Sequence, residues 1–194
     1  MHHQDCGGRK KTVKEIRLHG RGGQGVVMAS EILAAAFVAE GKYATAFPSF
    51  GVERRGAPVS AFIRLDETDI RERTQVYFPD CLIFADPFFK DVSQVYAGLK
   101  ANGILILNSR EALTNTPNEN VKTAGTINAT GIALEEIKRP STNTCLVGAF
   151  AATTGWVSLD SVLAALKEFW SGKALEGNKQ CARRGYAEVQ VTRF

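Results

Sequence analysis

The sequence lacks the clustered cysteines and histidines that a metal site needs. Its four cysteines contain no C-x-x-C pair, and its three histidines stand at no ligand spacing from them. Zinc and iron–sulfur centres take ligands that are grouped in the chain. We therefore expect no metal site here, and any redox metal that this protein works with must lie on another chain. Cys81 and Cys145 lie in apolar runs and are expected to be small buried hydrophobic residues.

A long hydrophobic run is also missing. No segment approaches the roughly 18–20 uncharged apolar residues of a membrane-spanning helix. Residues 1–14 (MHHQDCGGRKKTVK) lack the apolar middle segment of a secretory signal peptide. We therefore expect a cytoplasmic protein that makes no membrane contact.

Excess charge is small outside the N-terminus. The formal net charge of the 194 residues is +4, and residues 1–14, with four basic and one acidic residue, contribute +3 of it. A nucleic-acid-binding domain usually carries its excess on the folded part, so we expect no nucleic-acid partner. The composition, 44% hydrophobic and 23% charged, is typical of globular proteins. We predict a flexible basic arm over 1–14 and one domain over 15–194.

What the chain does contain is an alternation of strand-like and helical segments. Short apolar or alternating runs predict strands at 15–19, 43–47, 59–65, 81–85, 104–107 and 121–128. Helical spacing of apolar residues, caps and glycine stops predict helices at 26–40, 88–99, 130–138, 144–154, 159–170 and 178–189. Several strands are apolar throughout, as expected where both faces are buried. The fold class is therefore α/β, with a single doubly wound, mostly parallel sheet and helices on both faces.

A glycine-rich turn, Gly20–Gly25 (GRGGQG), follows the first strand and opens the first helix. Glycines allow a sharp turn and a close approach of the backbone to a ligand, and a helix N-terminus favours a phosphate. An NAD site would also need an acidic residue at the end of the second strand. The acid at that distance, Glu40, lies at the helix end instead. The motif thus favours phosphate binding without ordinary NAD binding; a turn that is glycine-rich for packing alone is the alternative.

The loop after the second strand carries Glu53-Arg54-Arg55-Gly56. Loops that follow alternate strands of such a sheet gather at one edge, so we expect this loop near the glycine turn. An arginine pair can bind phosphate oxygens and stack on adenine. It can equally contact another subunit or stay solvated. A phosphate-rich ligand without ribose-diol recognition could be coenzyme A or an NADP-like molecule.

Three other polar residues were considered. Asn143 and Asn178 each stand at the start of a predicted helix, where a capping role is sufficient. His19 ends the first strand without an acidic or nucleophilic partner and is expected to be structural. Neither a Ser/His/Asp set nor a carboxylate pair is evident. On its residues alone, the chain is a binding component and not a complete catalyst.

Several segments together resemble the γ subunit of 2-oxoacid:ferredoxin (acceptor) oxidoreductases of the pyruvate synthase type. They are EIRLHGRGGQGVVMASEILAAA, AFPSFGVERRGAPVSAFIRL, DIRERTQVYFPDCLIFAD, GIALEEIKRPSTNTCLVGAFAATTG and NKQCARRGYAEV. The resemblance covers about residues 15–190 in one order.

The resemblance implies a multi-subunit enzyme that decarboxylates a 2-oxoacid such as pyruvate on thiamine diphosphate. Thiamine diphosphate, Mg²⁺ and [4Fe–4S] clusters would lie on partner alpha, beta and delta (ferredoxin-like) subunits. Electrons would pass to ferredoxin or another acceptor, and the acyl group to coenzyme A. The γ chain would have no catalytic residue of its own and would be inactive alone. Its implied coenzyme A contacts are Gly23, Gln24, Gly25, Val26, Val27, Arg54, Asn143 and Asn178.

Two other functions stay open at this point. The chain could be a stand-alone NADP-binding oxidoreductase that uses Arg54 and Arg55 for the extra phosphate. It could also be a non-catalytic assembly subunit without a ligand. Within the first interpretation, the sequence does not choose between pyruvate, branched-chain, aryl (such as phenylglyoxylate) and 2-oxoglutarate substrates.

Overall fold

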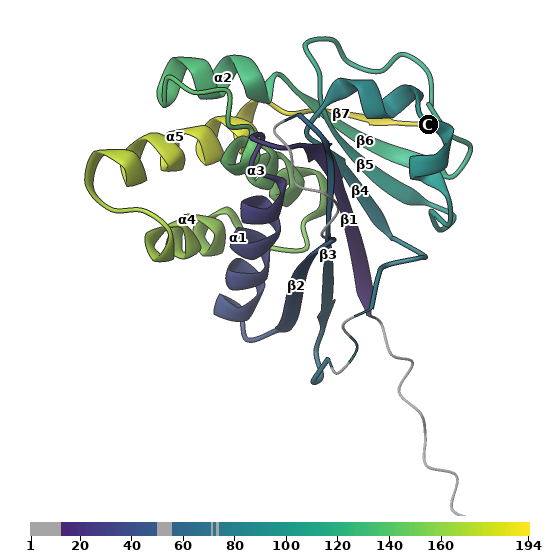
Figure 1. Cartoon of the computed structure of the whole chain (residues 1–194), viewed down its shortest axis with the longest axis horizontal. Coiled ribbons are helices and arrows are strands. Elements are labelled where there is room, and N and C mark those ends of the chain that lie inside the picture. Colours follow the sequence, from purple (N-terminus) through teal and green to yellow (C-terminus); the bar gives the residue numbers. More distant parts are fainter. Residues whose placement is uncertain (1–12, 50–55, 71, 73) are drawn as a thin grey trace, which may run out of the picture.

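A single seven-stranded sheet organises the chain, in the strand order β2-β3-β1-β4-β5-β6-β7 (Figure 1). The computed structural model describes residues 13–49, 56–70, 72 and 74–194. The strands are β1 Lys14–Arg21, β2 Tyr43–Ser49, β3 Pro58–Asp66, β4 Cys81–Phe84, β5 Gly103–Asn108, β6 Val121–Ile127 and β7 Gln190–Arg193. The α-helices are α1 Val26–Ala39, α2 Ala129–Glu136, α3 Asn143–Thr154, α4 Leu159–Ala165 and α5 Gly172–Glu188. Three 3₁₀ helices are η1 Pro87–Asp91, η2 Ser93–Tyr96 and η3 Leu166–Glu168.

The α/β class and the single sheet are confirmed, but the sheet is mixed. The central strands β1, β4, β5 and β6 pair in parallel. The outer pairings β2–β3, β3–β1 and β6–β7 are antiparallel. Adjacent parallel strands need a long crossover, and only eight residues separate β2 from β3 in the sequence. The parallel part is therefore limited to the centre.

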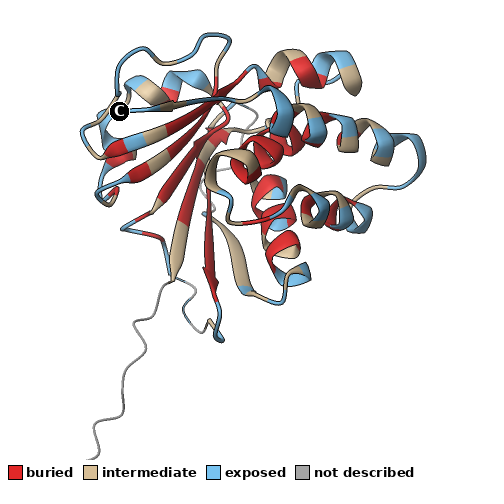
Figure 2. Cartoon of the chain, turned by 180° about the vertical axis from the view of Figure 1, so that it is seen from behind, coloured by how far each residue is buried: buried red, intermediate tan, exposed pale blue. Residues whose placement is uncertain are grey.

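Helical segments cover both faces of the sheet, as predicted, but very unequally (Figures 1 and 2). One buried cluster joins the sheet to residues of all five α-helices. The cluster on the other face is smaller and takes Phe89 of η1 and Tyr96 of η2. The prediction of a regular helix over 88–99 is therefore wrong. Val92 interrupts it with an extended backbone, φ −96° and ψ 101°.

Two glycines allow α3 and α5 to cross very closely. A Cβ atom on Gly148 would overlap the carbonyl oxygen of Ala182, and one on Gly185 would overlap that of Cys145. Helix α5 begins at Gly172, so the predicted start at 178 is wrong. The glycines that weaken the local helical signal are needed for packing.

Other differences from the sequence-based elements are small. Lys14, assigned to the arm, begins β1. The predicted helix 159–170 is divided into α4 and η3, and the short, mostly exposed edge strand β7 was not predicted. Residues 1–12 lie outside the described residues. None of the helices in the described part of the chain is long and apolar enough to span a membrane.

Replacing Gly185 by alanine should lower the free energy of unfolding by about 1–3 kcal/mol, because the added methyl group meets backbone and not a movable side chain. Gly177→Ala is the matched control on the same helix. Its Cβ would lie 2.9 Å from the Cγ2 methyl of Ile137 and 3.5 Å from the Glu136 carbonyl oxygen, without the backbone overlap found at Gly185, and alanine favours helix by about 1 kcal/mol. Urea denaturation of the purified chain measures both. Equal stability of the two variants would contradict the close crossing.

Candidate functional site

The glycine turn between β1 and α1 is shaped by residues that tolerate no side chain. Gly23 and Gly25 have φ angles of +98° and +78°, where other residues are strained. A Cβ on Gly20 would overlap Val26 and lie 3.0 Å from the Cβ of Ala85. A Cβ on Gly25 would lie 2.9 Å from Nδ2 of Asn143. The turn is therefore pressed against β4 on one side and against the start of α3 on the other.

The side chain of Gln24 holds the turn closed. Its Oε1 accepts a hydrogen bond from the backbone N–H of Arg21 at 2.7 Å. The backbone N–H of Gln24 donates to the Arg21 carbonyl at 3.1 Å. Within the described residues, the N–H groups of Gly25, Val26 and Val27 donate no hydrogen bond. These three amides stand at the positive end of α1, where anions are stabilised. These amides are the feature on which the prediction of phosphate binding at the turn depends.

The end of the loop that precedes β3 lies beside the turn. The N–H of Gly22 donates to the carbonyl of Ala57 at 3.0 Å, and the N–H of Gly56 donates to Gly22 at 3.4 Å. Arg21 adds an ion pair to Asp86 at 2.8 Å. The expected position of this loop near the glycine turn is therefore confirmed for the last residues of the loop, Gly56 and Ala57. Glu53, Arg54 and Arg55 lie outside the described residues.

A groove of about 650 Å³ opens next to the turn, between α2, α3 and α5. Its size is suitable for a ligand of cofactor dimensions. It brings together Asn143 and Asn178, which are far apart in sequence, and reaches Met28, the residue after Val27. Asn143 also lines the small hollow at the turn, with Gln24, Gly25 and Val26. Asn143 is therefore the residue that the turn and the groove share.

Asn143 and Asn178 make different hydrogen bonds in the groove. Neither is the helix cap that the sequence suggested. Asn143 is the first residue of α3; its Oδ1 accepts bonds from the Thr144 N–H at 2.9 Å and from the Ser141 hydroxyl at 3.2 Å. Its Nδ2 has no hydrogen-bond partner among the described residues. Asn178 lies in the middle of α5; its Oδ1 accepts from the Thr144 hydroxyl and its Nδ2 donates to Ala174. Asn178 thus ties α5 to α3.

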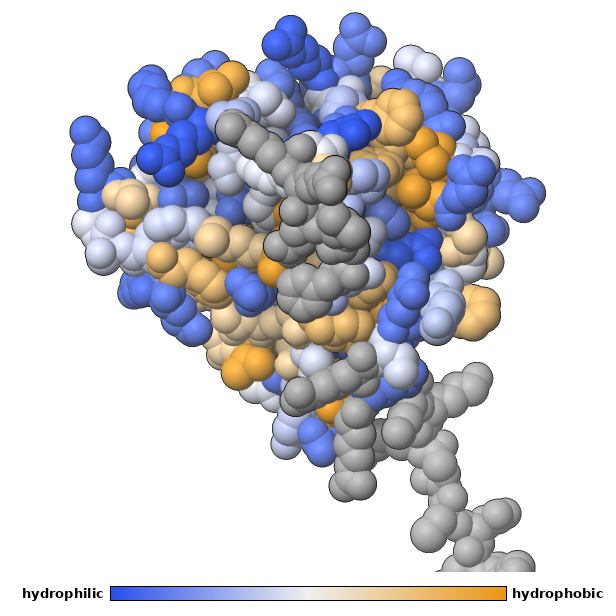
Figure 3. Space-filling model, in the orientation of Figure 1, coloured by the Kyte–Doolittle hydropathy of each residue, from blue (hydrophilic) through white to orange (hydrophobic). Residues whose placement is uncertain are grey.

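Sequence reasoning missed the cationic rim of the groove, formed by Lys138, Arg139 and Lys173, and its aromatic wall, Trp170. The three cations are exposed. The one acidic residue in the lining, Glu136, is paired with Arg184 at 2.9 Å. The signal in the sequence was the pair Lys138-Arg139 just before Pro140 and a helix. In Figure 3, hydrophilic side chains crowd the surface over α2 and α5, at the upper left.

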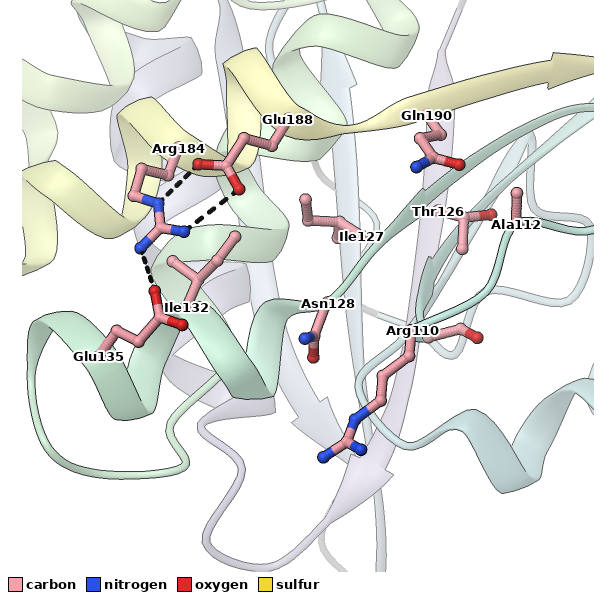
Figure 4. Close-up of a pocket in the computed structure, with 11 residues that line it drawn as sticks. Arg110, Ala112, Thr126, Ile127, Asn128, Ile132, Glu135, Arg184, Glu188 and Gln190 are labelled. Atoms are coloured by element: carbon pink, nitrogen blue, oxygen red, sulfur yellow. Dashed lines mark hydrogen bonds and ion pairs between the residues drawn. The ribbon is translucent and has the colours of Figure 1, made fainter.

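A second pocket, of about 170 Å³, lies at the ends of β5 and β6 (Figure 4). Three of its four charged residues pair with one another: Arg184 contacts Glu188 and Glu135, each at 2.6 Å. None of the predicted site residues lines it. The groove is therefore the better candidate for a ligand site.

Glu40 is far from the turn, at the opposite end of α1. It accepts hydrogen bonds from Lys42 and from the Ser158 N–H, both at 2.7 Å. These bonds, opposed by partial burial, lower the pKa of the Glu40 carboxyl to about 2. Glu40 thus fixes the start of α4 and is not placed to hold a ribose at the turn.

His19, near the end of the first strand, does not supply an acid–base group to the turn. Its Nδ1 lies 3.1 Å from the Ser60 hydroxyl and its ring packs against Phe84 and Phe89. Its Nε2 is buried without a partner in the described part of the chain, so the predicted structural histidine is only half satisfied. Burial and the nearby Arg17 lower the His19 pKa to about 3. His19 is therefore neutral near pH 7.

The cysteines that the structure describes are buried. Cys81 and Cys145 have no exposed surface, as expected, and the same holds for Cys181. Burial raises the pKa of each thiol, that of Cys181 to about 11. The described residues contain no group of three or more histidine, cysteine, aspartate or glutamate side chains that could hold a metal ion. The site can bind, but it contains no activated nucleophile.

Known proteins are similar to this chain over almost its whole length. The profile of the family described as pyruvate ferredoxin/flavodoxin oxidoreductase matches residues 15–188. Pyruvate synthase subunit PorC of Methanothermobacter thermautotrophicus is 50% identical, over 92% of this chain and 97% of the relative. The γ subunit of NADH-dependent phenylglyoxylate dehydrogenase of Aromatoleum evansii is 49% identical, over 91% and 94%. The crystal structure of pyruvate oxidoreductase subunit PORC of Thermotoga maritima is 35% identical with a TM-score of 0.81, over 93% and 98%.

His19 should make the fold sensitive to mild acid. Its pKa is about 3 in the folded chain, against an ordinary value of 6.5. Between these values the unfolded chain binds a proton that the folded chain excludes, so stability falls as the pH falls, by at most about 1.4 kcal/mol per pH unit. His19→Phe should remove the contribution of His19 to this dependence of the free energy of unfolding on pH. Urea denaturation of both proteins across this window measures the difference, and parallel curves would refute it.

Proposed function

Because the chain belongs to the pyruvate ferredoxin/flavodoxin oxidoreductase family, we propose that it is the γ subunit of a multi-subunit 2-oxoacid oxidoreductase and docks coenzyme A. The partner subunits would hold thiamine diphosphate, Mg²⁺ and [4Fe–4S] clusters and would pass electrons to ferredoxin or another acceptor. Relatives named for pyruvate and for phenylglyoxylate are almost equally similar. The similarity therefore leaves the 2-oxoacid open within this class.

The observation that carries the coenzyme A assignment is that Asn143 belongs to both the glycine turn and the groove. Coenzyme A needs a site for its phosphates and a longer channel for its pantetheine. The unpaired amides at Gly25–Val27 suit the phosphates, and the groove, with Met28 and Trp170 in its lining, suits the less polar part.

In this proposal the chain binds and orients but does not react. The turn amides and the Asn143 Nδ2 donate hydrogen bonds to the bound molecule, and Asn178 keeps α5 against α3 so that the groove retains its shape. When bound, coenzyme A supplies the thiol that accepts the acyl group. Docking raises the local concentration of that thiol at the partner's active site, which lowers the barrier through proximity.

The geometry favours this function over the other two. A stand-alone NADP oxidoreductase needs a ribose-binding group at the end of the second strand, and Glu40 is committed to α4. A subunit without a ligand would have no use for a groove of cofactor size beside the turn. The predicted role of Arg54 remains a proposal of the same kind, because Arg54 lies outside the described residues.

Asn143→Asp should raise the KM for coenzyme A about tenfold or more, because it removes a donor and adds a negative charge facing phosphates. The acceptor oxygen that binds Thr144 is kept, so the start of α3 should be preserved. Steady-state kinetics of the assembled enzyme at saturating 2-oxoacid measure the effect. Asn128→Asp, the same change at the second pocket, is the control. An unchanged KM in the Asn143 variant would count against the assignment.

The chain should also depend on partners for turnover. Affinity purification of the tagged native chain is expected to bring thiamine- and cluster-binding subunits with it, since the described residues hold no metal-ligand group. The purified chain alone should neither oxidise 2-oxoacids nor bind NADP. Turnover by the chain alone, or tight NADP binding in calorimetry, would support the stand-alone oxidoreductase instead.

A further inference from the structure

The second pocket, at the ends of β5 and β6, plays no part in the function proposed above (Figure 4). Its volume of about 170 Å³ equals that of roughly six water molecules, at about 30 Å³ each in the liquid. Sites for drug-sized ligands and cofactors usually measure about 300–1,000 Å³, so this pocket is too small for a nucleotide. Ligands of α/β proteins bind beyond the carboxyl ends of the parallel strands, where this pocket lies. The pocket is therefore suited to a small molecule.

A buried hydroxyl in the wall of this pocket has no partner. Thr126, near the end of β6, is 3% exposed, and its Oγ1 forms no hydrogen bond within the described residues. Thr126 lines the pocket, and in Figure 4 its hydroxyl points toward Ala112, which lines the pocket too. Buried hydroxyls in folded proteins are almost always hydrogen-bonded, because an unpaired one is costly. The Thr126 hydroxyl therefore indicates a polar ligand in the pocket.

The charges around the pocket are separated by sign. The guanidinium of Arg184 forms ion pairs with three carboxylates, those of Glu188, Glu135 and Glu136, at 2.6–2.9 Å. Glu135 and Glu188 line the pocket, so the side that α2 and α5 form carries excess negative charge. Arg110, on the loop after β5, forms no ion pair within the described residues, and Figure 4 shows it apart from the acidic group. The pocket therefore offers both a negative and a positive partner to a ligand.

We propose that this pocket binds a small free α-amino acid with an apolar side chain, such as alanine. Its ammonium group binds the carboxylates of Glu135 and Glu188, and its carboxylate binds Arg110 and the Thr126 hydroxyl. A simple anion would leave the acidic side unpaired, and a simple cation would leave Arg110 unpaired, whereas a zwitterion pairs both. The apolar part of the wall receives the side chain and is formed by Ala112, Ile127 and Ile132.

This site is separate from the proposed coenzyme A site. Among the described residues, none lines both the second pocket and the groove. The amino acid is therefore an additional ligand of the chain, and its binding does not require coenzyme A.

The test titrates three probes of similar size into the isotopically labelled full chain and follows the backbone amide signals by NMR. L-Alanine carries both charges, propionate lacks the ammonium group, and isopropylamine lacks the carboxylate. L-Alanine should shift the signals of Arg110, Thr126 and Ile127 in a saturable way, with a Kd in the millimolar range. Each of the other two probes should bind at least about tenfold more weakly, because one of its charge-assisted contacts is missing.

Two variants test the residues that carry the proposal. Thr126→Val removes the unpaired hydroxyl and keeps the shape of the side chain, so the chain should fold normally. Arg110→Ala shortens an exposed side chain. Each variant should weaken L-alanine binding about tenfold. Arg193→Ala, which changes an exposed arginine of β7 outside the pocket, is the matched control and should leave the Kd unchanged.

Three outcomes would overturn the proposal. Equal affinity for L-alanine and either single-charge probe would show that the pocket does not recognise a zwitterion. If no probe gives saturable shifts, water alone fills the pocket. An unchanged Kd in both variants would place L-alanine binding elsewhere on the chain. None of these outcomes affects coenzyme A docking, which the kinetics of Asn143→Asp test separately.

Discussion

The absence of a side chain at Gly25 is the constraint on which the site depends. The space that a Cβ would take is occupied by Asn143, whose Nδ2 would lie only 2.9 Å away. Helices α1 and α3 can therefore begin close to each other. A larger residue at position 25 would be strained at φ +78° and would push α3 outward. The glycine turn and the start of α3 would then separate.

The packing of α5 on α3 also fixes the position of α5, which lines the groove on the side away from the turn. Gly148 and Gly185 bring α3 and α5 into backbone contact, so α5 follows α3 closely. Asn178 and Thr144 add a buried hydrogen bond at 3.2 Å between the same two helices. Asn178 is 5% exposed. A buried amide without its partners would be costly, so the side chain both requires and enforces this arrangement.

Much of this could be predicted from the sequence, and the failures have a common cause. The six predicted strands, the glycine turn and the helix that begins at Val26 all carry local signals, namely apolar runs and glycine at positive φ. The segment 88–99 fails because long-range contacts decide its conformation. The guanidinium of Arg17, buried in β1, donates to the carbonyls of Val95 and Ala97, which a regular helix would have used internally. No local pattern reports such a bond.

The candidate site also has one part that the local sequence indicates and another part that only the folded chain brings together. The glycine turn is contiguous in sequence, so its motif is visible before the chain is folded. The groove is assembled from α2, α3, α5 and the residue after the turn, so its cations stand among ordinary surface lysines until the chain is folded. Asn178 is a similar case, because two glycines that precede it, Gly172 and Gly177, obscure the helix that positions it.

The chemistry that the described residues can supply is limited by burial as much as by residue type. His19 cannot take a proton near pH 7, because burial and Arg17 lower its pKa to about 3. The three described cysteines cannot act as thiolates, because burial raises their pKa values. The same burial that makes these groups inert makes the scaffold rigid. A rigid scaffold can hold a bound molecule in one position, so the described residues are suited to binding more than to reaction.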